Sequence, residues 1–261
     1  GSRPAAQVQR RTPGTSSGHP PRQRAMSRTV AIIGGTGKTG KWAVKAALVR
    51  GHRVRLLARS PSKAKALLKE LFPEEDKESQ VAMVEGSISD ADKLAELFSG
   101  ADVIMSFLGM VKPPEWVVRP GVEAIMTAMK SMESPPKFLC MSSIALGDSL
   151  AQGRKAWGRM TTWLCLKVAL KSVFADMQAA EDYILENRGD LNVTIARATI
   201  LKDKKGYLKD YASDGKSYKF VRVDEKAKLS FQIDRQHVAE AFLDLCDKTE
   251  YDNQCVSIFS A

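Results

Sequence analysis

Histidine and cysteine are scarce in this sequence of 261 residues, which has three histidines and four cysteines. The cysteines lie far apart, with no Cys-x-x-Cys pair and no neighbouring histidine, at Cys140, Cys165, Cys246 and Cys255. This spacing predicts no structural metal, no Ser-His-Asp triad and a reducing environment. Charged residues also interrupt every apolar stretch before it reaches the roughly 18 residues that a membrane span needs. We therefore expect a soluble protein without a transmembrane segment.

Acidic residues are absent from the first part of the chain, where Glu70 is the first. Residues 1–28 combine arginines with Ser, Thr, Pro and Gly and have no apolar periodicity, which predicts a disordered basic leader. Its composition fits either an organelle transit segment or an expression-vector remnant. The expected location is accordingly the cytoplasm, or an organelle matrix or stroma. The other cations before Glu70 lie around a glycine turn and the second expected strand, which favours a small anionic ligand over nucleic acid.

Past the leader, apolar strands alternate with helical patterns through residues 29–261. Strands are expected at 28–33, 53–58, 81–86, 102–109, 137–143, 192–198 and 255–259. Helical periodicity occupies 41–50, 90–98, 120–132, 173–189 and 233–248. The pattern predicts a single α/β domain with a doubly wound, mostly parallel, Rossmann-like sheet and helices on both faces. Ligands of such folds bind at the carboxyl ends of the strands.

The first expected strand runs into the glycine-rich stretch "AIIGGTGKTG", residues 31–40. A turn so poor in side chains lets the backbone approach a bulky anion, and the helix after it directs N–H groups at that anion. The Gly-x-x-Gly-x-x-Gly spacing is looser than the common dinucleotide fingerprint, and it lacks the ending of a triphosphate loop. The stretch predicts a phosphate site; the alternative is a tight strand-to-helix turn with no ligand.

Arg59 closes the second expected strand in "LLARSPSK", where many dehydrogenases place an acidic residue against the adenosine ribose of NAD. An arginine there, with Lys63 and two serines nearby, suits the 2′-phosphate of NADP, because charge-assisted hydrogen bonds to phosphate are strong. The sequence therefore predicts that NADP(H) is preferred over NAD(H). The alternative is a solvated basic corner.

These motifs, with "VEGSISD", "DVIMSFLG", "FLCMSS" and "IDRQHVAEAF", resemble the atypical short-chain dehydrogenase/reductases with an NmrA-like NAD(P)-binding domain. Within that group the chain is most similar to the flavin reductase (biliverdin-IXβ reductase) family. The resemblance implies hydride transfer from NADPH to a flat, conjugated small-molecule acceptor such as a flavin or linear tetrapyrrole. It also implies contacts by position: the pyrophosphate with Gly34, Thr36, Gly37, Lys38, Thr39 and Gly40; the 2′-phosphate with Arg59 and Lys63; the adenine with Ser87 and Ile88; the nicotinamide ribose with Leu108 and Gly109; and the nicotinamide region with Ser142, beside Ser143.

The sequence departs from the wider superfamily at the Tyr-x-x-x-Lys pair that usually passes the proton. Val173 and Met177 occupy those two positions, and Tyr183 comes too late, so a packing role is expected for it. Flavin and biliverdin reductases also manage without the pair, because delivery of a hydride to a conjugated acceptor depends mainly on alignment. The rival interpretation is a non-catalytic, NmrA-like NADP(H) sensor or scaffold that binds a protein partner.

Ser142 is the remaining polar candidate for catalysis, since a hydroxyl at a strand end can donate to the acceptor or to a water. The alternative is that this serine ends the strand and bonds to the local backbone. The family's adenine-loop aspartate and its histidine after the sixth strand have no counterpart here, where Ser87 and Ala198-Thr199 stand instead.

Residues 149–172 form an inserted basic segment that contains Trp157 and Trp163. Helical spacing predicts that four apolar side chains share one face, Trp157, Met160, Leu164 and Val168. We expect a lid over the nicotinamide pocket, with protein docking, an anionic membrane surface and simple packing on the domain as alternatives.

Overall fold

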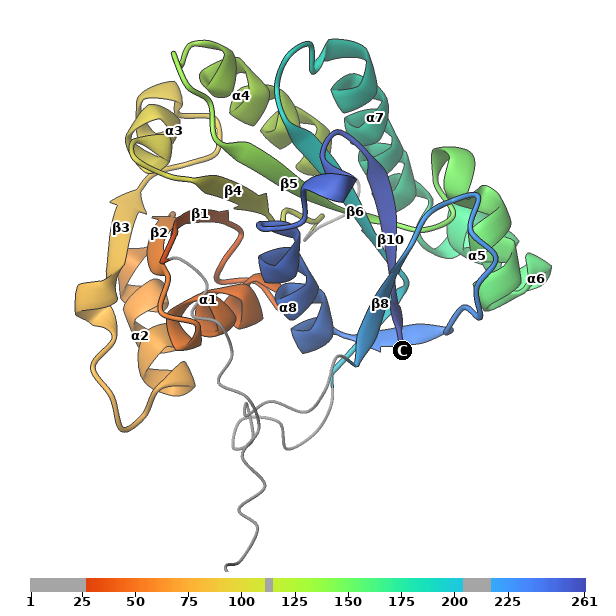
Figure 1. Cartoon of the computed structure of the whole chain (residues 1–261), viewed down its shortest axis with the longest axis horizontal. Helices are drawn as coiled ribbons and strands as arrows, with labels where there is room; N and C mark the ends of the chain where they lie inside the picture. Colours follow the sequence, from red (N-terminus) through yellow and green to blue (C-terminus); the bar gives the residue numbers. More distant parts are fainter. Residues whose placement is uncertain (1–26, 111–114, 204–216) are drawn as a thin grey trace, which may run out of the picture.

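An eight-stranded sheet forms the centre of the molecule in the computed structural model, which describes residues 27–110, 115–203 and 217–261 (Figure 1). The strand order is β3-β2-β1-β4-β5-β6-β10-β8. Neighbouring strands are parallel except for the last pair, so the predicted doubly wound, mostly parallel sheet is confirmed. The strands are β1 (Thr29–Ile33), β2 (Arg53–Ala58), β3 (Val81–Glu85), β4 (Val103–Ser106), β5 (Lys137–Ser143), β6 (Val193–Ala198), β8 (Tyr218–Val221) and β10 (Cys255–Ser260). The expected leader lies outside the described residues, apart from its last two.

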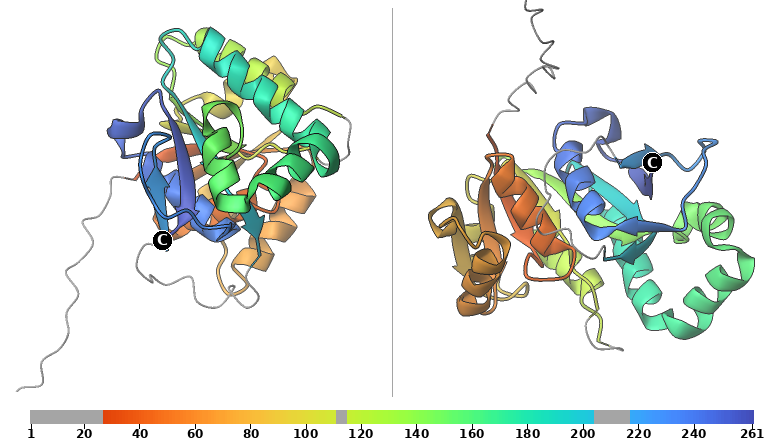
Figure 2. Two further views of the ribbon diagram at one scale, coloured as in Figure 1. Left: turned by 90° about the vertical axis from the view of Figure 1, so that its right-hand side faces the viewer. Right: turned by 90° about the horizontal axis from the view of Figure 1, so that it is seen from below.

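Helices cover both faces of this sheet (Figure 2). One layer contains α1 (Gly40–Val49), α2 (Pro61–Leu71) and α8 (Arg235–Leu245); the other contains α3 (Ala91–Phe98), α4 (Val118–Lys130) and α7 (Lys171–Asn187). Successive residues of a strand point to opposite faces. In β1, Val30 and Ile32 pack with the first layer, whereas Ala31 and Ile33 pack with the second. Burial on both faces explains why the strand reads as an unbroken apolar run.

The strand order reverses between β1 and β4, which are neighbours in the sheet although β2 and β3 separate them in the chain. In their register Ile33 lies opposite Ser106, so both strands end at the same edge. A doubly wound sheet opens a crevice outside the carboxyl ends of its strands at such a reversal. The glycine turn follows β1 at this edge.

Several short elements were not anticipated. α2 follows Arg59, β8 pairs antiparallel with β10, and β7 (Ile200–Lys202) and β9 (Gln232–Asp234) form a separate two-stranded parallel sheet. The inserted segment forms α5 (Leu150–Trp157), α6 (Arg159–Leu164) and a π-helical turn, Cys165–Ala169, at the margin of the molecule (Figures 1 and 2).

The single apolar face expected in the inserted segment is wrong. Gly158 adopts a φ of 84°, a left-handed value that ends α5 and redirects the chain into α6. Trp157 consequently turns into the protein and is 5% exposed, whereas Met160, Leu164 and Val168 lie on the surface. Within the described ranges, none of the helices combines the length and the hydropathy needed to cross a lipid bilayer.

Candidate functional site

The glycine turn has a shape that other residues would disrupt. Gly34 has a φ of 76°, and a Cβ there would lie 2.8 Å from the carbonyl oxygen of Phe107, just after β4. A Cβ at Gly40 would collide with the Gly34 carbonyl. The Gly37 N–H donates to that same carbonyl at 2.9 Å, which closes the turn. Because α1 begins at Gly40, its first-turn N–H groups face the turn, as in anion sites at helix N-termini.

A cavity of about 800 Å³ lies beside this turn, at the carboxyl ends of β4, β5 and β6. Side chains and backbone from two sides line it. The turn and the strand ends supply Gly37, Lys38, Thr39, Phe107, Leu108, Gly109, Met110, Met141, Ser142, Ser143, Ala198, Thr199, Ile200 and Leu201. The facing wall consists of Trp157, Cys165, Leu170, Val173, Phe174, Met177 and Arg235. The inserted segment therefore forms part of the wall of the cavity, and the lining is mostly apolar.

Seven of the predicted site residues line this cavity together: Gly37, Lys38, Thr39, Leu108, Gly109, Ser142 and Ser143. Gly34 and Gly40 shape the turn, and Thr36 is exposed on it. The other predicted residues lie outside the cavity, near the ends of the neighbouring strands β2 and β3: Arg59, Lys63, Ser87 and Ile88.

Arg59 and Lys63 are exposed at the end of β2 and in the first turn of α2. No carboxylate pairs with either of them in the part of the chain that the structure describes. The hydroxyls of Ser60 and Ser62 lie 3.0 Å apart between them. Two cations without a protein counterion, at the start of a helix, leave their hydrogen-bonding capacity available to an anionic ligand.

Ile88 and Leu108 converge on α4 at Gly121. A Cβ there would lie 3.3 Å from the Ile88 side chain and would overlap that of Leu108. Ser87 closes its own turn, because its hydroxyl accepts a hydrogen bond of 3.1 Å from the Ser89 hydroxyl. Leu108 follows β4 and Ile88 follows β3, so the two side chains form an apolar surface between the ends of these strands.

Ser142 presents a buried hydroxyl without a partner. The residue is 3% exposed, and its Oγ makes no hydrogen bond within the described residues. The alternative that this hydroxyl bonds to the local backbone is therefore not what the structure shows. Because most buried polar side-chain atoms are hydrogen-bonded, an unpartnered hydroxyl on a cavity wall is suited to a ligand.

The positions of the superfamily's Tyr-x-x-x-Lys pair face the cavity but hold apolar side chains, Val173 and Met177. Tyr183 lies elsewhere on α7, where the Arg119 guanidinium stacks 3.8 Å from the centroid of its ring. This tyrosine has the packing role expected from the sequence. Proton transfer by a tyrosine–lysine pair thus cannot occur at these two positions.

An ion pair that sequence reasoning missed holds α7 against the sheet. Arg197 in β6 donates to both carboxylate oxygens of Glu181 at 3.0 and 2.7 Å and also pairs with Asp148. Burial works to lower the pKa of Arg197, but the hydrogen bonds and charge of Glu181 outweigh it and raise that pKa. The position of Arg197 in the buried strand β6 suggests a buried side chain, but no sequence pattern shows that Glu181 and Asp148 are its partners.

A second buried carboxylate on α7 caps a neighbouring helix. Asp176 accepts hydrogen bonds from the backbone N–H groups of Val117 and Val118, at the start of α4.

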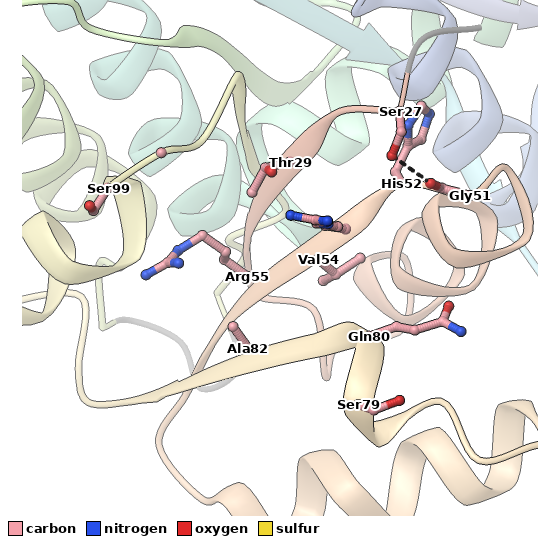
Figure 3. Close-up of a pocket in the computed structure, with 12 residues that line it drawn as sticks. Ser27, Thr29, Gly51, His52, Val54, Arg55, Ser79, Gln80, Ala82 and Ser99 are labelled. Atoms are coloured by element: carbon pink, nitrogen blue, oxygen red, sulfur yellow. Dashed lines mark hydrogen bonds between the residues drawn. The ribbon is translucent and has the colours of Figure 1, made fainter.

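A second hollow, of about 630 Å³, lies at the amino ends of β1, β2 and β3, opposite the glycine turn (Figure 3). One of its cations, Arg55, already serves the fold, since its guanidinium donates to the carbonyl of Leu97 at 2.9 Å and also to that of Glu96. Figure 3 also shows the hydrogen bond between Ser27 and Gly51. Ligands of doubly wound sheets bind at the other edge. Nowhere in the described ranges do three His, Cys, Asp or Glu residues approach closely enough to hold a metal ion.

A model of the NAD(P)H-binding family matches residues 34–249, from the glycine turn to beyond α8. The chain belongs to the NAD(P)H-binding family. The match covers most of the sequence and confirms the family expected from the glycine turn and the strand-end motifs.

Two curated relatives of this NAD(P)H-binding protein are named as redox enzymes. An oxidoreductase of Aspergillus parasiticus is 25% identical over 178 residues, which cover 65% of this chain and 64% of the relative. A bifunctional pinoresinol-lariciresinol reductase of Linum usitatissimum is 27% identical over 159 residues, covering 60% of this chain and 48% of the relative. The chain thus spans less than two thirds of the length of either relative.

Solved structures share the fold of this NAD(P)H-binding protein along most of its length. A wide-type short-chain dehydrogenase/reductase of Veillonella parvula, in complex with NADP, has a TM-score of 0.64 at 16% identity and covers 90% of this chain and 95% of its own. An anaerobilin reductase of Escherichia coli O157:H7 has the same TM-score and identity, with coverages of 89% and 96%. A putative NADH-flavin reductase of Streptococcus pneumoniae reaches 0.60 at 18% identity, with coverages of 90% and 100%.

Proposed function

We propose that the protein is an NADPH-dependent reductase that transfers a hydride to a flavin, a tetrapyrrole or another conjugated small molecule. One observation carries the proposal. A mostly apolar cavity adjoins the glycine turn and, among the described residues that line it, one has a buried hydroxyl without a partner, Ser142. Such a cavity, with few polar groups at defined places, is the usual form of a small-molecule site.

The residues around the turn fit a dinucleotide. Gly34 and Gly40 let the turn pack closely on Phe107 and on itself, since a Cβ at either position would meet backbone atoms, and the N–H groups at the start of α1 beside this turn suit a pyrophosphate. Arg59 and Lys63 would hold the 2′-phosphate, which makes NADP(H) the preferred cofactor. When bound, NADPH supplies the hydride for the reaction. Leu108, Gly109 and Ser143 would position the nicotinamide end in the cavity.

The walls of the cavity favour a flat, apolar acceptor. Trp157, Phe174, Met141 and Met177 offer aromatic and thioether surfaces, and the positions of the missing tyrosine and lysine add no acid. A conjugated acceptor suits such a site, because alignment of the acceptor matters more than a strong protein acid. The Ser142 hydroxyl would donate to the acceptor atom that gains electron density, while a proton from water completes the reduction. Flavin reductase and anaerobilin reductase among the proteins of similar fold are consistent with this substrate class.

The test is a titration of NADPH binding followed by NADPH oxidation with FMN, riboflavin, biliverdin and quinones as acceptors. Turnover of one of these acceptors, with a kcat at least about tenfold lower in Ser142→Ala, would support the proposal. Ser131→Ala is the matched control, since this exposed serine at the end of α4 lies outside the cavity.

The apolar residues Val173 and Met177, at the positions of the superfamily's tyrosine–lysine pair, also support a second candidate, a non-catalytic NADP(H) sensor or scaffold. Tight NADPH binding with no turnover of any acceptor would favour this candidate and overturn the reductase. Failure to bind NADPH at all would contradict both.

A further inference from the structure

The outer surface of α6 and the π-helical turn after it concentrates exposed apolar side chains. Nine large apolar side chains are exposed among the described residues, and four of them lie here: Met160, Trp163, Leu164 and Val168. Met160 is 76% exposed and Trp163 is 56% exposed. Scattered apolar residues on a surface are ordinary, but a contiguous patch marks an interaction site. We name these four residues the outer face.

Positive charge surrounds the outer face. No acidic residue occurs between Asp148 and Asp176, and the exposed cations of this stretch include Arg154, Arg159, Lys167 and Lys171. None of these four forms an ion pair with a carboxylate in the portion of the chain that is described. Their charge is therefore available to an external anionic surface.

A hollow of about 560 Å³ lies between α5 and α6 at this place. Arg154, Arg159 and Lys167 line it, together with Met160, Trp163 and Leu166. The three cations can bind phosphate groups, and the apolar side chains beside them can contact hydrocarbon chains.

The fold holds this face outward. Trp157 anchors the end of α5 in the protein, Lys155 donates to the Ala227 carbonyl at 2.8 Å, and Gly158 then redirects the chain. The Thr162 hydroxyl donates to the Gly158 carbonyl at 2.8 Å and fixes the start of α6. These contacts pin α6 with Met160, Trp163 and Leu164 exposed, while Cys165 and Leu170, which follow α6 in the chain, line the cavity.

We propose that the outer face docks on an anionic phospholipid bilayer, with the Arg154, Arg159, Lys167 and Lys171 cations on lipid phosphates. Interfacial segments combine a tryptophan-containing apolar side with lysine and arginine, and each basic residue at an anionic surface strengthens binding about fivefold. The uniform sign of the charge favours a lipid surface, which is anionic throughout, over a protein surface of mixed sign. Docking is independent of the proposed reductase activity.

The test is co-sedimentation of the full chain with vesicles of phosphatidylcholine, with and without about one third phosphatidylserine. We expect binding to the anionic vesicles that weakens as salt increases, because exposed charges are screened. Trp163→Ser/Leu164→Ser should lower the partition coefficient at least about tenfold. The control is Trp116→Ser, which removes a tryptophan that is 48% exposed outside the patch and should leave binding unchanged.

Charge reversal distinguishes binding through the cations of this face from binding through the arginines of residues 1–28, because those arginines remain in every variant. Arg159→Glu/Lys167→Glu should reduce binding by more than about tenfold, whereas Lys69→Glu/Lys130→Glu, with the same change of net charge on α2 and α4, should reduce it far less. Retained NADPH binding would verify the fold of each variant. Absence of binding to anionic vesicles, or equal losses in both charge-reversal variants, would overturn the proposal and leave a protein partner as the occupant.

Discussion

The indole N–H of Trp157 donates a hydrogen bond of 2.8 Å to the hydroxyl of Thr199, and this hydroxyl in turn lies 2.7 Å from the Phe231 carbonyl, to which it donates. Trp157 ends α5, Thr199 follows β6, and Phe231 precedes β9. The rings of Trp157 and Phe174, the latter on α7, also meet edge to face, with centroids 6.2 Å apart. One threonine therefore ties the inserted segment to the sheet at the wall of the cavity.

Removal of this hydroxyl should loosen the wall. Thr199→Val leaves the Trp157 N–H and the Phe231 carbonyl without partners, so we expect the free energy of unfolding to fall by about 1–3 kcal/mol, measured by urea denaturation. The control Thr127→Val changes an exposed threonine on α4 and should alter the free energy of unfolding by less than about 0.5 kcal/mol. Equal stabilities of Thr199→Val and the wild type would contradict the assigned role.

Arg59 should set the choice of cofactor. Arg59→Ala should weaken NADPH binding about ten- to a hundredfold, because one or two charge-assisted bonds to the 2′-phosphate are lost, and should affect NADH far less. Fluorescence titration with both cofactors measures the difference. Arg53→Ala, at the opposite end of β2, is the matched control and should change neither affinity. Equal losses for NADPH and NADH in Arg59→Ala would rule out the 2′-phosphate assignment.

Cys165 should be the cysteine that alkylates first in the folded protein. Burial raises the pKa of Cys246 to about 12 and that of Cys255 to about 11, and it also raises the pKa of Cys140. Since the thiolate is the reactive form, these three should react slowly with iodoacetamide near pH 8, whereas the partly exposed Cys165 on the cavity wall reacts. Mass spectrometry should find one modified site, absent in Cys165→Ser. Comparable labelling of Cys255 would be inconsistent with this order.

His52 should make stability depend on pH in mildly acidic solution. Burial, followed by the charge of Arg50, lowers its pKa from an ordinary value of 6.5, and its Nδ1 accepts the Arg28 N–H at 3.2 Å, as a neutral imidazole does. A lowered pKa in the folded state means that the unfolded chain takes up the proton first. The contribution of neutral His52 to the free energy of unfolding is therefore complete above about pH 6.5, and it is lost as the pH falls below that value. Denaturation between about pH 5 and 8 should show a weaker pH dependence in His52→Asn, and an unchanged dependence would contradict the prediction.

Periodicity and turn chemistry predicted the elements that pack on both faces of the sheet. The seven expected strands and the five expected helices all form, because buried parallel strands and two-turn or longer amphipathic helices impose strong apolar patterns. The glycine turn was recognisable because a backbone that passes so close to Phe107 requires glycine.

Apart from α2, which has 11 residues, the missed elements are short or depend on distant partners. β7 and β9 have three residues each, too few for a pattern, and β8 is defined by antiparallel pairing with β10. The face expected through Trp157 and Met160 was wrong because a left-handed glycine broke the helix between them. The hydroxyl of Thr199 and the carboxylate of Glu181 act across the fold, so their roles were readable only in three dimensions.

The place of β10 has a consequence for the order in which the fold is assembled. Cys255–Ser260 follows every other strand in the chain, yet it lies inside the sheet, between β6 and β8. During synthesis β8 therefore emerges from the ribosome with no strand to join, and β6 keeps an open edge. Since domains fold as units once their partners are present, the sheet closes only after these six residues have been translated. A nascent chain shortened before Cys255 should contain β1 and the glycine turn but lack the strand that joins β8 to β6.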